Sequence, residues 1–82
     1  MDEKEILGII QELVCYVLGD DEIVLTEATV LQDDIEEWSS LALAQVLTAI
    51  EKEFSMHFSL NDIISMNTVG DIIIAIRTAK NE

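Results

Sequence analysis

The stretch that decides the fold is EEWSSLALAQVLTAIEKEF, residues 36–54. Behind its two serines, apolar residues follow an i, i+3, i+4, i+7, i+11 spacing at Leu43, Val46, Leu47, Ile50 and Phe54. This period predicts a helix over about 40–54 with one buried face. A serine oxygen can accept a hydrogen bond from an unpaired amide of the first turn, so either Ser39 or Ser40 is expected to be the N-cap.

A second helix is expected upstream of this stretch. Apolar residues between Ile6 and Leu18 recur at helical spacing, which predicts a helix over about 3–18 that ends at Gly19. Gly8 inside it costs up to about 1 kcal/mol relative to alanine, and we interpret it as the mark of a close helix contact. Cys15 falls on the side opposite the apolar stripe, where we expect an inert thiol.

Two more helices are expected downstream. Ser59 and Asp62 stand three residues apart, an imperfect capping box that predicts a short helix over about 60–65. Thr68 and Asp71 repeat this pattern before an isoleucine-rich run. That run predicts a final helix, which ends near Ala79.

The segment between the first two long helices, residues 20–39, has no sustained period and carries eight acidic groups. A structureless connection of this length is unusual in a compact domain. We therefore expect it to be held to the core by apolar side chains and to contain a short helical turn at most. The candidate side chains are Leu25, Val30, Leu31 and Ile35.

Together these elements predict an all-α fold in a single domain of residues 1–82. The expected architecture is a four-helix bundle with three long helices, one short third helix and a long loop between the first two. Its core is expected to contain Ile6, Ile10, Leu13, Val17, Leu43, Val46, Leu47, Ile50, Ile72, Ile73 and Ile76.

Charge and composition restrict the partners. Seventeen acidic residues against four basic ones give a formal net charge of −13, which repels nucleic acids and anionic membrane surfaces. Partners are therefore expected to carry basic patches, and the protein is expected to be a monomer.

No apolar run approaches the roughly 20 residues that span a bilayer. A single cysteine cannot form an internal disulfide, so we expect a cytoplasmic protein.

The sequence offers few groups for catalysis or metal binding. Its one histidine, His57, has no cysteine or second histidine nearby, and we interpret it as an exposed loop residue. The acidic clusters at 20–22 and 33–37 lack the glycine and glutamate spacing of an EF-hand loop. Neither an enzyme nor a dedicated metal site is expected.

The run SSLALAQVLTAIEKEF resembles the second helix of the acyl carrier protein family, in which a serine followed by leucine opens a helix that ends in acidic residues and phenylalanine. The resemblance spans almost the whole chain, including TVGDIIIAI at residues 68–76. It implies a 4′-phosphopantetheine arm, derived from coenzyme A, that holds acyl groups as thioesters. By this correspondence the attachment residue is Ser40, because Leu41 follows it directly.

This chain departs from the family pattern near the serine. Ser39 stands where the family usually has aspartate, and Ala42 and Gln45 replace acidic residues that fatty acid carriers usually have on the exposed face of this helix. Negative charge lies upstream instead. We therefore expect partners to dock on four loop carboxylates and two outer-face residues of the helix, namely Asp33, Asp34, Glu36, Glu37, Leu41 and Ala44.

The resemblance implies a carrier without catalytic residues that serves fatty acid or related biosynthesis. Its expected partners are a phosphopantetheinyl transferase and acyl-loading or acyl-processing enzymes. Two alternatives stay open. Trp38 and the neutral helix start favour a carrier for polyketide or nonribosomal peptide assembly, and the missing aspartate at Ser39 favours an unmodified protein-interaction module.

Overall fold

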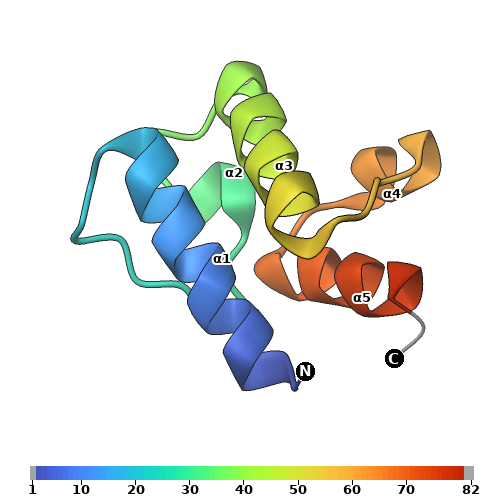
Figure 1. Ribbon diagram of the computed structural model, residues 1–82. Coiled ribbons are helices and arrows are strands. Elements are labelled where there is room, and N and C mark those ends of the chain that lie inside the picture. The colour runs from blue at the N-terminus through green and yellow to red at the C-terminus, as the bar shows by residue number, and fades with distance from the viewer. Residues whose placement is uncertain (1, 81–82) are drawn as a thin grey trace.

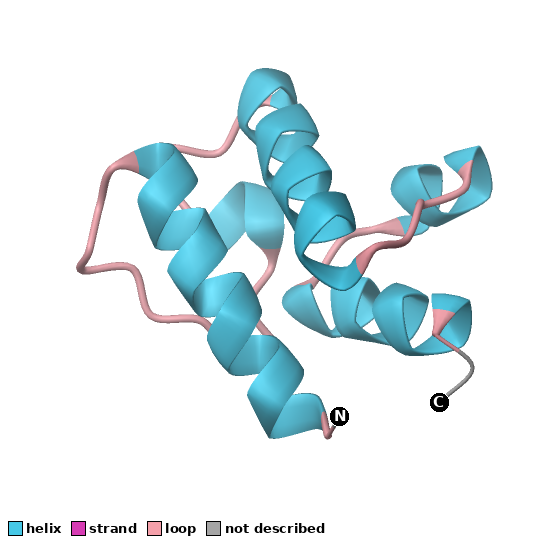
Figure 2. Ribbon diagram, in the orientation of Figure 1, coloured by secondary structure: helices cyan, strands magenta, loops and turns pink. Residues whose placement is uncertain are grey.

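The computed structural model describes residues 2–80, which form five helices and no strand (Figures 1 and 2). In chain order these are α1 (Glu3–Leu18), α2 (Leu31–Asp34), α3 (Ser40–Phe54), α4 (Leu60–Ser65) and α5 (Val69–Ala79). The predicted all-α fold is confirmed, since α1, α3, α4 and α5 match the four expected helices. The α2 helix is the short helical turn expected in the long loop. Between residues 2 and 80, no helix is both long and apolar enough to cross a membrane.

Side-chain caps and one glycine set the helix ends. Asp2 accepts a hydrogen bond from the Glu5 amide at 2.8 Å and so caps α1. Gly19 ends that helix in the left-handed region, with φ of 67°, which glycine adopts without steric cost. Both predicted capping boxes are complete, with Ser59 capping α4 and Thr68 capping α5. These local signals explain why the predicted bounds agree with the structure.

The core lies where α1, α3 and α5 meet (Figure 1). Of the residues predicted for the core, eight are buried, and Leu13, Val17 and Leu43 are half-buried at its edge. Each fully buried aliphatic side chain contributes about 1.5–3 kcal/mol to folding. The eight buried residues are Ile6, Ile10, Val46, Leu47, Ile50, Ile72, Ile73 and Ile76.

The long segment between α1 and α3 is held down as expected. Leu25, Leu31 and Ile35 are buried in the same core, whereas Val30 is half-buried. Backbone hydrogen bonds join the segment to the start of α5, from the Leu31 amide to the Asn67 carbonyl and from the Val69 amide to the Thr29 carbonyl, both at 3.0 Å. The segment is therefore packed against the core and hydrogen-bonded to the start of α5.

Three interpretations of single residues were wrong. Cys15 is buried, because residues 23–25 of the loop fold over the side of α1 that periodicity alone assigns to solvent. Ala42 is buried too, because it lies one turn before Val46 on the inner face of α3. Gly8 marks no close contact, since a Cβ atom there would meet nothing within 4 Å.

Candidate functional site

The two adjacent serines at the start of α3 have different positions. Ser39 has an extended backbone and is the N-cap, with its Oγ accepting a hydrogen bond from the Ala42 amide at 3.1 Å. Its carbonyl oxygen accepts from the Leu43 amide at 2.9 Å, the first bond of the helix. Ser40 is the first helical residue, and its side chain is exposed. Because Ser39 supplies the cap, the Ser40 hydroxyl is not needed for it.

The position of Ser40 suits a negatively charged substituent. The first amides of a helix lack intrahelical partners, and the helix dipole places partial positive charge there. The first turn of α3 contains no acidic residue. A phosphodiester on the Ser40 oxygen would therefore sit beside unpaired amides with no carboxylate in the same turn to repel it.

A groove of about 330 Å³ opens next to Ser40. It runs between α2, the start of α3 and the segment that follows α4, and Ser40 itself forms part of its wall. Its lining residues are Val30, Leu31, Gln32, Asp33, Trp38, Ser39, Ser40, Leu43, Met66 and Asn67. Trp38 was singled out from the sequence, whereas Met66 and Asn67 were not, because no local pattern connects these two residues to the serine.

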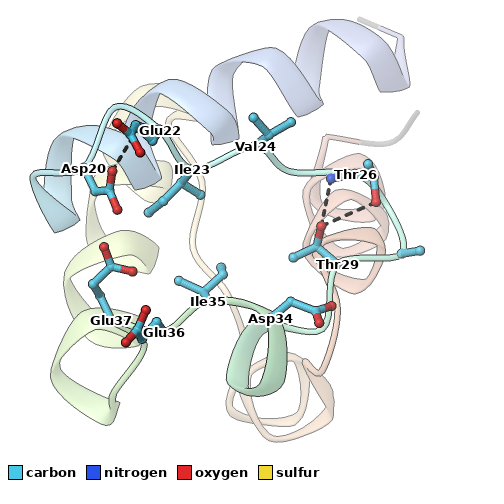
Figure 3. A pocket seen from close by; sticks show the side chains of 11 residues that line it. Asp20, Glu22, Ile23, Val24, Thr26, Thr29, Asp34, Ile35, Glu36 and Glu37 are labelled. Atoms are coloured by element: carbon cyan, nitrogen blue, oxygen red, sulfur yellow. Dashed lines mark hydrogen bonds between the residues drawn. The ribbon is translucent and has the colours of Figure 1, made fainter.

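A second cavity, of about 550 Å³, lies within the long loop and is lined by several carboxylates (Figure 3). Interaction between the Asp20 and Glu37 carboxyls raises the pKa of Glu37 and lowers the pKa of Asp20. The Glu22 amide, which donates to Asp20 Oδ1 at 3.0 Å, lowers the pKa of Asp20 further. The Asp20 and Glu37 side chains come from the two ends of the long loop and line the same cavity.

The structure divides the four loop carboxylates between these two cavities. Asp33 lines the groove beside Ser40, whereas Asp34, Glu36 and Glu37 line the loop cavity. All four are exposed. The Asp34 carboxylate also accepts a hydrogen bond from the Val30 amide at 2.7 Å, which gives it a role in holding α2.

The two helix residues of the expected docking face are both exposed. Leu41 has 68% of its surface exposed, although it is a large aliphatic residue in the first turn of α3. Ala44 lies one turn of helix further along and is exposed as well. An apolar side chain is therefore open to solvent directly beside Ser40.

Comparison with known proteins gives the class. A family model for the phosphopantetheine attachment site matches residues 8–76. The holo acyl carrier protein of Geobacter metallireducens superposes with a TM-score of 0.83 at 27% identity, over 92% of this chain and 85% of that one. A protein of Mycobacterium tuberculosis assigned as an acyl carrier protein gives a TM-score of 0.78 at 30% identity, over 87% and 93%. The chain belongs to the phosphopantetheine-attachment family of acyl carrier proteins.

Family membership confirms three expectations from the sequence. Acyl carrier proteins are carriers rather than catalysts, their cofactor is covalent phosphopantetheine, and their fold is a helical bundle. The exposed Ser40 hydroxyl at a helix start fits that cofactor.

His57 is exposed, 3.8 Å from the Glu51 carboxylate. Within residues 2–80, no three histidine, cysteine or acidic side chains are grouped to hold a metal ion.

Proposed function

We propose that Ser40 of this chain carries 4′-phosphopantetheine and that the protein presents acyl thioesters to partner enzymes. The observation that carries this proposal is the separation of the two serines, because Ser39 caps α3 and leaves the Ser40 hydroxyl exposed. In the attachment reaction, the Ser40 oxygen forms a bond to the β-phosphorus of coenzyme A as the bond to 3′,5′-ADP breaks. The hydroxyl proton passes to the transferase. The attached arm ends in a thiol, which supplies the thioester.

The contribution of this chain is to position the arm. A flexible tether converts each encounter with a partner's active site into a search at high effective concentration. The α3 helix begins at Ser40 and packs on the core through Val46 and Ile50, so the attachment point is rigid. The arm then moves relative to a fixed base.

We propose that partners bind the surface formed by the four loop carboxylates, Leu41 and Ala44. The net charge of −13 favours partners with basic patches, which speeds encounter more than it adds affinity. Two of the four basic residues have partners within the chain, since Arg77 pairs with Glu3 at 2.6 Å and the Lys80 ammonium donates to the Phe54 carbonyl at 2.9 Å. Exposed Leu41 supplies the apolar contact in this surface.

Fatty acid or related biosynthesis is the pathway we propose, with a monomeric single carrier domain of residues 1–82 in the cytoplasm. Self-repulsion at −13 supports the monomer, and the lone free cysteine supports a reducing compartment. A second candidate, a carrier for polyketide or nonribosomal peptide assembly, is supported by Trp38 and by the absence of acidic residues in the first turn of α3.

One experiment tests the attachment site. The protein is incubated with coenzyme A, magnesium and a broad-specificity phosphopantetheinyl transferase, and intact masses are compared. The wild type and Ser39→Ala should gain one phosphopantetheine, and Ser40→Ala should gain none. No gain in the wild type would support the unmodified interaction module instead. Supplying the holo protein to fatty acyl-transferring enzymes and, in parallel, to amino acid-adenylating enzymes then separates the two candidate pathways.

A further inference from the structure

The groove beside Ser40 has the composition of a binding site for an amphipathic chain. We propose that it holds the pantetheine part of the arm against the Trp38 indole, so that the unloaded arm rests on the protein; this rests on the proposed attachment at Ser40. The groove starts at Ser40 itself, so an arm attached there reaches it without crossing another element.

Part of the groove lining is apolar. Trp38 and Met66 are half-buried and pack against the core cluster, as does Leu43 on α3. The Trp38 amide donates to the Ile35 carbonyl at 3.1 Å, which fixes the backbone that carries the indole. Pantetheine contains a dimethyl-substituted carbon and methylene groups, which gain free energy when such a wall removes them from water.

The rest of the lining includes polar, uncharged residues. Gln32 and Asn67 belong to the groove lining, and a carboxamide can both donate and accept hydrogen bonds. The Asn67 Nδ2 group also donates to the Ser65 carbonyl at 3.4 Å. The two amides of pantetheine need such partners when they leave water. The Asn67 backbone is held on both sides, because its amide donates to Asp71 at 2.9 Å and its carbonyl accepts from Leu31 at 3.0 Å. The backbone position of Asn67 is therefore fixed.

Charge and size restrict what enters the groove. Asp33 is its one acidic lining residue, so it repels the phosphodiester and keeps that group at the α3 amides while the uncharged pantetheine enters. Small-molecule pockets are about 300–1,000 Å³, and the groove, at about 330 Å³, stands at the lower end of that range. Its volume is in the range of sites that take one small ligand.

The test uses Trp38, the only tryptophan of the chain, as its reporter. Apo protein is converted to holo protein, conversion is verified by intact mass, and the acrylamide quenching of tryptophan fluorescence is compared. Quenching should fall in the holo form, and nuclear Overhauser contacts should join the indole protons to the pantetheine methyl groups. Both measurements use the wild type, so neither depends on the folding of a variant.

A variant series gives a second readout. After subtraction of the apo rate, which accounts for buried Cys15, the arm thiol should react with a disulfide reagent several-fold faster in Trp38→Ala than in wild type. Tyr16→Ala, which removes an exposed aromatic outside the groove, should leave that rate unchanged. A full mass gain with unchanged quenching and no indole contacts would overturn this proposal alone. No mass gain would overturn the attachment at Ser40 and this proposal with it.

Discussion

The Gln11 side chain on α1 accepts a hydrogen bond from the Leu25 amide, 14 residues later in the chain, at 2.6 Å. The same carboxamide donates to the Ile23 carbonyl. One side chain thus serves both a donor and an acceptor of the loop backbone, and it places the loop over Cys15. The middle of the long loop is held to α1 by this polar bridge as well as by the buried Leu25.

Replacing Gln11 should release this part of the loop. Gln11→Ala leaves the Leu25 amide without its partner and the Ile23 carbonyl with only the Cys15 thiol at 3.4 Å. An unsatisfied, partly buried group costs about 1–3 kcal/mol. The free energy of unfolding from urea titration should fall by about that amount. Gln45→Ala, at an exposed site on α3, should stay within about 0.5 kcal/mol of wild type. Equal effects of the two variants would show that the bridge contributes nothing.

The contacts of Gln11 with the loop also show which part of the fold the sequence did not predict. The helices were predicted well because periodicity and capping residues are local, as at Thr68 and Asp71. Burial of Cys15 was missed because it depends on where a loop without a period folds back. The carboxamide that directs this folding gives no pattern in the sequence.

The candidate site was likewise predicted only in part. Ser40 and Leu41 were found because the serine and leucine are adjacent at a helix start. The groove was not predicted, since Met66 and Asn67 belong to the segment after α4 and reach the groove only through tertiary packing. The acidic residues between 33 and 37 look continuous in the sequence, but the turn of α2 directs Asp33 to one cavity and Asp34 to the other.

Ser39 should be needed for the stability of α3 rather than for attachment. Ser39→Ala removes the bond to the Ala42 amide and should lower the free energy of unfolding by about 1 kcal/mol. Ser39→Asp keeps an N-cap acceptor and should restore that stability. Both variants should still be modified when loading is followed by intact mass under conditions where they are folded. Loss of modification in Ser39→Ala while Ser40→Ala still gains mass would reverse the assignment of the two serines.

Two glycines should respond to alanine with opposite signs. At Gly70, a Cβ atom would lie 3.1 Å from the Glu27 carbonyl oxygen, the atom that accepts from the Gly70 amide at 2.9 Å. Moving that backbone to relieve the contact should cost about 1 kcal/mol or more. At exposed Gly8, alanine meets nothing within 4 Å and should stabilise α1 by up to about 1 kcal/mol. Thermal unfolding of the two variants checks this, and a Gly70→Ala protein that melts above wild type would contradict it.

Asp71 should make stability fall in acid. The Asn67 and Thr68 amides donate to its carboxylate at 2.9 and 3.0 Å and lower its pKa below the ordinary 3.8. A group with a depressed pKa stabilises the fold above its unfolded value, and this contribution is lost as pH falls through the folded value. Unfolding free energies measured below about pH 4 should therefore decline less steeply in Asp71→Asn than in wild type. Asp21→Asn, in the exposed loop, controls for the loss of one charge, and identical slopes for Asp71→Asn and wild type would refute the role of this carboxylate.

Reversing the loop charges should slow loading by the transferase. Asp34 is left unchanged because it also holds the Val30 amide at 2.7 Å, so the test uses Asp33→Lys, Glu36→Lys and Glu37→Lys together. If basic partners dock on this loop, kcat/KM for the apo protein should fall by roughly tenfold at low salt. A triple variant with the same change in net charge, Glu5→Lys, Glu12→Lys and Glu53→Lys, should fall much less, because these exposed residues lie outside the docking surface.

Salt dependence distinguishes docking from a general charge effect. Screening shortens the reach of exposed charges to about 3 Å at 1 M salt, so the difference between the two triple variants should shrink there. Among single reversals, Asp33→Lys should have the largest effect, since Asp33 alone of the three lines the groove beside Ser40. Equal loading rates for both triple variants at low salt would mean that the transferase reads the overall charge and not this loop, and the docking surface would then have to lie on α3 alone, around Leu41.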